Sequence, residues 1–189
     1  MKLIEKTNID IDTLYSELEK QFPKCEMKPK EIFAQIIQNP SYKVYFITND
    51  DNNTCGYFTF LELEDNTILI DYFAINKECH SQGIGTKTFN EMKKYFSYNG
   101  CYLEVEQKSK QDINTIRRAN FYEKLGAKLI DIQYTYPNND GGLPMDLYFM
   151  PFSKDYFPDR KNTLKNIKTV FEKLHFDITF AENIYAELK

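Results

Sequence analysis

The stretch from residue 71 to residue 92 constrains the fold of this chain more than any other part of the sequence. A mainly apolar run at 68–75 leads into a short polar loop that closes with Gly83-Ile84-Gly85. A helix pattern follows at once, because apolar residues recur at helical spacing from Phe89 to Phe96. A strand, a glycine turn and a helix start in this order leave several backbone N–H groups free for an anion. We therefore expect this loop to bind the pyrophosphate of a nucleotide-like cofactor, with both glycines allowing a phosphate to approach the backbone.

Length and composition indicate one folded, soluble domain. The chain has 189 residues, of which 42% are hydrophobic and 15% aromatic, so it is long enough and apolar enough to bury a core. The formal net charge of −4 argues against non-specific binding of nucleic acids, which requires a basic face. The sequence has neither a signal-peptide pattern nor an apolar run of about 20 residues. We therefore expect a cytoplasmic protein with no nucleic-acid or membrane partner.

Metal sites and disulfides are not indicated by the sequence. The four cysteines are far apart and form no Cys-x-x-Cys pair, so they suggest reduced structural thiols rather than a disulfide framework or a zinc site. The two histidines, His80 and His175, are also far apart, which gives no support to a histidine zinc site or a Ser-His triad. We expect no metal cofactor, and we expect His175 to be structural or solvated.

Hydrophobic periodicity and turn residues predict the element order β-α-α-β-β-β-α-β-α-β-β-α. Short turns make the strands in the middle of the chain antiparallel, whereas helical crossovers flank the strand at 101–106. We therefore predict an α/β fold, with a mixed, mostly antiparallel central sheet of about six to seven strands and helices on both faces. The predicted strands are 2–7, 42–48, 54–63, 67–75, 101–106, 127–136 and 143–152. The predicted helices run from residue 10 or 12 to 22, from 29 to 38, from the glycine turn to about 98, and from 113 to 125.

The end of the chain is predicted to be an addition to the main fold. No flexible linker or internal repeat divides the sequence, so we expect one domain over residues 1–157. Residues 158–189 are expected to form a helical C-terminal extension packed on the same domain, because apolar residues recur at helical spacing from Leu164 to Leu174. Such a helix can cover an edge strand or form a homodimer contact.

The order of elements and two motifs resemble the GNAT superfamily of acyl-CoA-dependent N-acetyltransferases. The phosphate loop of that superfamily reads Gln/Arg-x-x-Gly-x-Gly/Ala after a strand that ends in a pattern like Leu-Ala-Val. Here the strand ends Phe73-Ala74-Ile75 and the loop reads His80-Ser81-Gln82-Gly83-Ile84-Gly85, so histidine stands where Gln or Arg is usual. The second motif, an aromatic pair near a helix end followed by glycine, is Phe121-Tyr122-Glu123-Lys124-Leu125-Gly126, with Arg118 where a small residue is usual. The resemblance covers about residues 1–155.

This resemblance implies that the co-substrate is acetyl-CoA or another acyl-CoA. The backbone N–H groups of residues 80–86 are then expected to hold the CoA pyrophosphate at the start of the following helix. The strands at 67–75 and 101–106 are expected to splay apart, so that pantetheine lies against the first strand and a backbone N–H near Ile75 polarises the thioester carbonyl. The candidate cofactor-binding residues are Phe73, Ala74, Ile75, His80, Ser81, Gln82, Gly83, Ile84, Gly85, Thr86 and Asn114. Lys87, Arg117 and Arg118 are either further phosphate contacts or solvated side chains.

Tyr122 is the candidate proton donor. Direct acyl transfer requires a neutral amine and a proton for the departing thiolate. The resemblance places Tyr122 at the position of a tyrosine whose hydroxyl lies near the CoA sulfur. An ordinary tyrosine pKa near 10 keeps such a donor neutral at pH 7. The alternative is that Tyr122 only packs at the edge of its helix and has no role in catalysis.

Asp71 and Glu104 are the candidate proton acceptors. Asp71 is predicted to lie on an otherwise apolar strand face, where burial raises the pKa of a carboxyl toward that of a useful base. The other residues predicted on that face are Leu69, Phe73 and Ile75. Asp71 is therefore either a base or anchor for the substrate amine, or a carboxylate tied to a neighbouring lysine or tyrosine. Glu104 on the adjacent strand is a second candidate base, and Glu62 is a third.

The acyl acceptor is expected to enter from the opposite end of the splayed strands. Residues of the first two helices are predicted to line this entrance, together with Tyr134, Tyr136 and the loop at 137–146. The aromatic and acidic character of this region, which includes Asp140 and Asp146, favours a cationic amine. We therefore expect the substrate to be the amine of a small molecule or a peptide.

Three other functions are consistent with parts of the sequence. A non-catalytic acyl-CoA-binding or regulatory domain needs the same loop but no catalytic residues. A dinucleotide-binding oxidoreductase is disfavoured because the third glycine position of its fingerprint holds Thr88. A protein-interaction module would use the amphipathic helix of the C-terminal extension.

Overall fold

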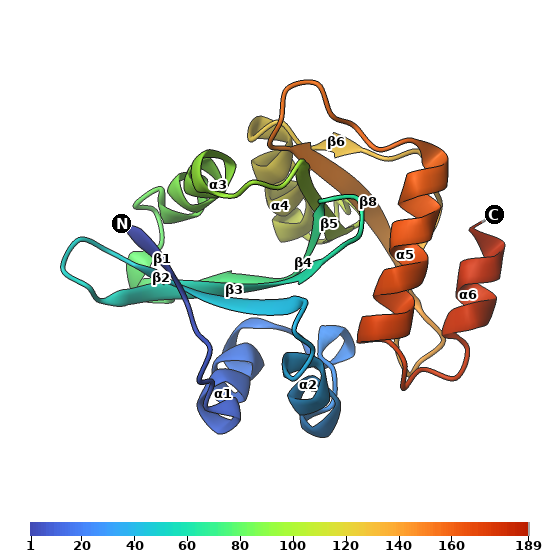
Figure 1. Cartoon of the computed structure of the whole chain (residues 1–189), viewed down its shortest axis with the longest axis horizontal. Helices are drawn as coiled ribbons and strands as arrows, with labels where there is room; N and C mark the ends of the chain where they lie inside the picture. Colours follow the sequence, from blue (N-terminus) through green and yellow to red (C-terminus); the bar gives the residue numbers. More distant parts are fainter. Residues whose placement is uncertain (189) are drawn as a thin grey trace.

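Eight strands form one sheet within residues 1–188, which are the residues that the computed structural model describes. The strand order is β1-β2-β3-β4-β5-β8-β6, with β7 also paired to β8 (Figure 1). In chain order the elements are β1 (Lys2–Glu5), α1 (Ile11–Gln21), α2 (Lys30–Ile37), β2 (Tyr42–Thr48), β3 (Thr54–Glu62), β4 (Ile68–Ile75), α3 (Ile84–Tyr95), β5 (Gly100–Glu106), α4 (Ile113–Lys124), β6 (Lys128–Leu129), β7 (Tyr134–Tyr136), β8 (Leu143–Pro151), α5 (Arg160–Leu174) and α6 (Ala181–Glu187).

The sheet is mixed, and its one parallel pair within the described residues lies at its centre. β4 and β5 run parallel, whereas the other neighbouring strands in the described sheet are antiparallel. The crossover from β4 to β5 passes through α3, as a parallel connection requires. This architecture confirms the predicted fold class, a mostly antiparallel sheet with helices on both faces.

The two faces of the sheet bury separate apolar clusters. One cluster gathers side chains of α1, α2, α5 and α6, including Leu14, Phe33, Phe171 and Ile184. The other gathers side chains of α3 and α4, including Phe89. Figure 1 shows the same division, with α1 and α2 on one side of the sheet and α3 on the other. The apolar run of β4 is explained by this arrangement, because a central strand is covered on both faces.

A β-bulge in β4 changes which way its side chains point. Thr59 of β3 pairs with Tyr72, but the next residue, Phe60, pairs with Ile70, so Asp71 is the extra residue. Beyond the bulge, Phe73 packs on Phe89 of α3, on the opposite face from the cluster that contains Tyr72. The prediction that Asp71 shares a face with Phe73 and Ile75 is therefore wrong, since strict alternation does not hold across a bulge.

Two further predictions are corrected beyond residue 126. The single strand expected at 127–136 is two short strands, β6 and β7, because the chain leaves the edge of β8 in a tight turn where the N–H of Ile132 bonds the carbonyl of Ile130 (2.9 Å). The C-terminal extension contains a second helix, α6, in addition to the expected one. No helix within residues 1–188 combines the length and the apolar character needed to cross a bilayer.

The helix α5 is tied to the sheet by polar contacts as well as apolar ones. The side-chain amide of Asn166 donates to Asp65 (3.0 Å) and to the hydroxyl of Tyr102 on β5 (3.1 Å). The ring of Phe171 lies 6.2 Å from that of Tyr134 on β7. The C-terminal helices thereby support the strands that form one wall of the candidate site.

Candidate active site

A cavity of about 100 Å³ opens where β4 and β5 separate. The two strands pair only over Ile68–Ile70 and Cys101–Leu103, and beyond the bulge at Asp71 they are no longer bonded to each other. The end of α1, the connection to α2, α4 and the strands β7 and β8 close the opening. The residues that line the cavity are Phe22, Glu26, Ile70, Asp71, Tyr72, Phe73, Leu103, Glu104, Val105, Glu106, Arg118, Tyr122, Tyr136 and Met145.

The open edge of β4 faces this gap. The N–H groups of Tyr72 and Asn76 point toward β3, where they bond the hydroxyl of Thr59 (3.1 Å) and the carbonyl of Cys55 (2.8 Å). Because successive backbone groups of a strand point to opposite sides, the N–H groups of Phe73 and Ile75 point away from β3. The expected position of a backbone donor near Ile75 therefore agrees with the register of the strand.

The loop before α3 presents a row of free backbone donors. The N–H groups of residues 81–86 have no hydrogen-bond acceptor within residues 1–188. The N–H of His80, which was predicted to belong to the same group, instead bonds the carbonyl of Lys77 (3.1 Å) and is not available. The free donors lie at the start of α3, where the helix dipole favours a negative charge. This geometry suits an anion with several oxygens, such as a diphosphate.

The two glycines of the loop lack a side chain for different structural reasons. Gly83 has a φ of +71°, and a Cβ added to it would meet no atom within 4 Å, so its missing side chain leaves open space in front of the loop. A Cβ added to Gly85 would lie 3.1 Å from the ring of Phe121. The space at Gly83 is open, whereas the absence of a side chain at Gly85 allows α3 to pack closely on α4.

The side chains of this loop mostly bind the loop itself. Nε2 of His80 donates to the carbonyl of Ile75 (2.7 Å), and the side-chain amide of Gln82 donates to the carbonyl of Glu78 (2.9 Å). Ser81 and Thr86 are exposed, and Ser81 takes a positive φ of 60°. The loop is therefore held by its own polar side chains, with its N–H groups left free.

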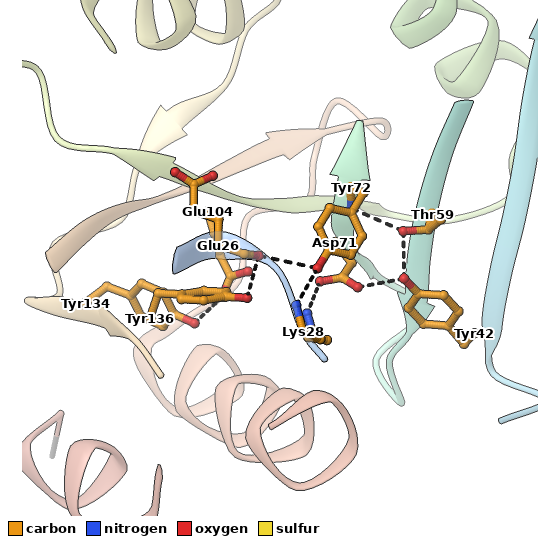
Figure 2. Close-up of polar contacts among 9 residues, drawn as sticks. All are labelled: Glu26, Lys28, Tyr42, Thr59, Asp71, Tyr72, Glu104, Tyr134 and Tyr136. Atoms are coloured by element: carbon orange, nitrogen blue, oxygen red, sulfur yellow. Dashed lines mark hydrogen bonds and ion pairs between the residues drawn. The ribbon is translucent and has the colours of Figure 1, made fainter. Parts of the chain in front are cut away.

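Asp71 is paired with a buried lysine. Its Oδ1 lies 2.7 Å from Nζ of Lys28, its Oδ2 accepts from the hydroxyl of Tyr42 (2.6 Å), and the Lys28 and Asp71 side chains are only 4% and 2% exposed. The pair lies between Tyr42 and Thr59 on one side and Glu104, Tyr134 and Tyr136 on the other (Figure 2). This arrangement agrees with the second of the two predicted readings, a carboxylate tied to a lysine and a tyrosine.

Glu104 is the carboxyl best suited to exchange a proton. It is half-buried on β5, lines the cavity and accepts a hydrogen bond from the hydroxyl of Tyr134. Burial raises its pKa to about 7, although Tyr134 and the nearby charge of Lys28 oppose that rise. A carboxyl with such a pKa exchanges its proton close to neutral pH.

Two carboxyl groups that line the cavity, Glu26 and Glu106, were not identified as site residues from the sequence. Glu26 reaches the cavity from the connection between α1 and α2, and burial together with the neighbouring Glu106 raises its pKa to about 7. Glu106 forms an ion pair with Arg118 of α4, whose side chain is 46% exposed, so Arg118 is partly solvated but is not a free phosphate ligand. Neither Glu26 nor Lys28 belongs to a sequence motif, so no local signal in the sequence identifies them.

Tyr122 lies in the same cavity with its hydroxyl unpaired. Its ring packs on Phe89 (5.8 Å between centroids) and Phe121 (5.1 Å). Within residues 1–188 the hydroxyl has no hydrogen-bond partner, and burial raises its pKa well above the ordinary value. Tyr122 is therefore both a packing residue and a neutral donor that faces the cavity.

Several other predicted residues lie outside the cavity. Glu62 bonds the hydroxyl of Tyr98 at the far end of β3, and Asn114 is exposed at the start of α4. Asp140 and Asp146 do not line the cavity, whereas Tyr136 does. Among the described residues no group of three or more His, Cys, Asp or Glu side chains is arranged to hold a metal ion.

Comparison with known proteins identifies relatives of this chain. The model of the acetyltransferase (GNAT) family matches residues 11–127. YjbC of Bacillus subtilis (strain 168), which carries the name of an acetyltransferase, is 30% identical over 110 residues. That match covers 58% of this chain and 54% of YjbC, so the chain spans about half the length of this relative.

Solved structures share the fold. A GNAT-family protein from Bacteroides thetaiotaomicron has a TM-score of 0.75 and 21% identity, covering 95% of this chain and 100% of that chain. An aminoglycoside 6'-N-acetyltransferase complexed with coenzyme A has a TM-score of 0.56 and 18% identity, covering 84% of this chain and 100% of that chain. At these identities the similarity concerns the fold.

Proposed function

The chain belongs to the acetyltransferase (GNAT) family, and from this premise we propose that it transfers an acetyl group from acetyl-CoA to a primary amine. One observation carries the proposal: the gap between β4 and β5 brings a free strand edge, Glu104 and Tyr122 to one cavity, next to a loop of free N–H groups. The alternative is a domain that binds acyl-CoA without catalysis, which would leave the pKa of Glu104 and the unpaired hydroxyl of Tyr122 without a role.

The residues present fit a CoA thioester. Acetyl-CoA supplies the activated acetyl group, and the solved relative with coenzyme A shows that this fold can hold the carrier. Here the N–H groups of residues 81–86 would hold the diphosphate, and the α3 dipole would add about 0.3–2 kcal/mol. The N–H groups of Phe73 and Ile75 on the open edge of β4 would bond the carrier and polarise the thioester carbonyl.

The proton donor and acceptor are assigned from the hydrogen bonds and ion pairs that the cavity side chains form. We assign Glu104 as the base that takes a proton from the substrate ammonium, because its pKa of about 7 allows it to accept protons at neutral pH. Asp71 is less suited, because its carboxylate is held by Lys28 and Tyr42. Tyr122 would pass a proton to the leaving thiolate and take up the second proton that the amine nitrogen loses as the amide forms, so the hydroxyl, whose pKa burial raises well above the ordinary value, ends protonated.

The acceptor is proposed to be a cationic amine of a small molecule or a peptide. Four carboxyl groups line the cavity (Glu26, Asp71, Glu104 and Glu106), whereas the cations Lys28 and Arg118 are each paired with one of them. Glu26 and Glu104 have no cationic partner among the described residues at ion-pair distance, so a positively charged substrate is favoured over an anionic one.

A thiol-release assay tests this function. The purified protein is incubated with acetyl-CoA and panels of polyamines, amino acids, aminoglycosides and peptides with free N-termini, and free CoA is measured. We expect amine-dependent release with at least one panel, together with an acetylated product by mass spectrometry. Binding of CoA without release on any panel would favour the non-catalytic alternative.

Substitution of Gly83 tests the loop. Gly83→Val fills the space in front of the free N–H groups and strains a backbone with φ of +71°, so the affinity for CoA should fall about tenfold. Isothermal titration calorimetry measures it. Gly126→Val is the matched control, because Gly126 also has a positive φ (+93°) and open space but follows α4. Equal affinities of wild type and Gly83→Val would exclude the loop as the diphosphate site.

Substitution of Tyr122 tests the proton donor. Tyr122→Phe keeps the aromatic packing and removes the hydroxyl, so kcat should fall about 10²-fold while KM for acetyl-CoA stays the same. Tyr95→Phe, at a residue of α3 that is 64% exposed, serves as the control and should have wild-type kinetics. An unchanged kcat for Tyr122→Phe would assign the donor to another group.

A further inference from the structure

Lys28 is a buried cation that the catalytic assignments do not use. Its ammonium is 2.7 Å from Asp71 and lies near the rings of Tyr72 (5.1 Å) and Tyr136 (5.8 Å). A buried charge is costly unless it is paired, so Lys28 and Asp71 depend on each other. The pair joins the connection between α1 and α2 to the bulge of β4, at the side of the cavity where the strands separate.

The backbone around Lys28 is held from several sides. The N–H of Lys28 donates to the hydroxyl of Tyr72 (3.3 Å), and its carbonyl accepts from Tyr15 (2.9 Å). The carbonyl of Glu26 accepts from the hydroxyls of Tyr72 and Tyr136, both at 3.3 Å. The segment 26–28 is thereby fixed to β4 and β7, which bracket the cavity (Figure 2). This fixes the charge of Lys28 relative to Glu104.

Glu104 is surrounded by groups of both signs. The hydroxyl of Tyr134 on β7 donates to Glu104, and Figure 2 shows Lys28 and Glu26 of the α1–α2 connection and Asp71 of β4 in the same cluster of side chains. The remaining charged or titratable groups that line the cavity are Tyr72, Glu106, Arg118, Tyr122 and Tyr136. Of the named charges, Lys28 favours the ionised form of Glu104, whereas Asp71 and Glu26 oppose it. Glu106 and Arg118 form their own ion pair.

We infer that Lys28 is a positioning residue for acetyl transfer: its ion pair with Asp71 holds the 26–28 segment against β4 and keeps a positive charge beside the carboxyl of Glu104. Lys28 acts through Glu104 and does not itself exchange a proton. The inference rests on the proposed function for its catalytic meaning, but the electrostatic coupling is a property of the folded protein. The two charges of the pair act on Glu104 in opposite directions.

Three variants separate this role from a structural one: Lys28→Met, Asp71→Asn and the double variant. The carboxyl of Glu104 is titrated by carbon-13 NMR of glutamate-labelled protein, with Glu104→Gln to assign the signal. The acidic limb of the pH profile of kcat/KM is measured in parallel. We expect the Glu104 titration to move up in pH for Lys28→Met, down for Asp71→Asn, and to lie between these in the double variant. Each unit of upward shift lowers kcat/KM about tenfold on the acidic limb.

The controls keep the outcomes distinct. Lys30→Met removes an exposed lysine that pairs with Asp12, and it should leave the titration unchanged. If Lys28→Met does not fold, Asp71→Asn and the double variant, which leaves no buried charge unpaired, still decide the question. Glu104 titrations that are the same in all folded variants, or that shift in the same direction for both single variants, would overturn the inference. A wild-type protein that transfers no acetyl group would contradict the proposed function. The NMR titrations would still show whether Lys28 and Asp71 act on the carboxyl of Glu104.

Discussion

Replacement of Glu104 by glutamine is expected to lower kcat/KM at pH 8 by about 10²–10⁴-fold, the usual contribution of a positioned general base. Glutamine keeps the shape of the side chain and an oxygen that can accept from Tyr134, but it cannot take a proton from the amine. The loss should appear in kcat, with CoA affinity by calorimetry unchanged. Glu62→Gln, outside the cavity, is the matched control and should retain wild-type activity.

The pH dependence of kcat/KM is a second test of the role of Glu104. Wild-type kcat/KM should fall as the pH is lowered through about 7, because Glu104 becomes protonated, and the residual activity of Glu104→Gln should lack this limb. The folded pKa of about 7 lies above the ordinary 4.5, so the contribution of this carboxyl to stability falls as pH rises between these values. Glu104→Gln should therefore be at least as stable as wild type at pH 8. Nearly full activity in a folded Glu104→Gln protein would remove Glu104 as the base.

Replacement of Lys28 by methionine is expected to lower the free energy of unfolding by about 3–5 kcal/mol, because it leaves the Asp71 carboxylate buried without its partner. Asp71 keeps the hydrogen bond from Tyr42, which does not neutralise the charge. Urea unfolding followed by circular dichroism measures the change, with the m-value as a check on two-state behaviour.

The double variant Lys28→Met/Asp71→Asn distinguishes pairing from packing. It removes both charges, so most of the lost stability should return. Lys30→Met, at an exposed lysine two residues away, should change stability by no more than about 0.5 kcal/mol. A double variant as unstable as Lys28→Met would indicate that the packing of the Lys28 stem, and not the charge pair, stabilises the fold.

The regular elements were predictable because their signals are local. The strand predicted at 42–48 is β2 with the same bounds, and Asp10 caps α1 through the N–H groups of Asp12 and Thr13. The side chains of β5 alternate as in a regular strand: Cys101, Leu103 and Val105 pack with α3 and α4, and Tyr102 packs on the other face. These features depend on residues that are close in sequence.

The features that were missed depend on distant partners. The bulge at Asp71 exists because β3 pairs with β4 in a shifted register, which no residue of β4 alone specifies. Glu26 lines the cavity and Lys28 reaches Asp71 because the connection between α1 and α2 lies against β4. Lys28 and Asp71 are 43 residues apart in the sequence. The sequence predicted that the carboxylate of Asp71 needs a partner, but it did not identify Lys28 and Tyr42 as the residues that pair with it.

The most direct test of the proposed site is a crystal structure of the protein with coenzyme A. We predict that diphosphate oxygens lie within hydrogen-bond distance of the N–H groups of residues 81–86, and that pantetheine runs along the open edge of β4 at Phe73 and Ile75 toward Tyr122. Coenzyme A bound elsewhere, with those N–H groups bonded to the protein's own atoms, would contradict it.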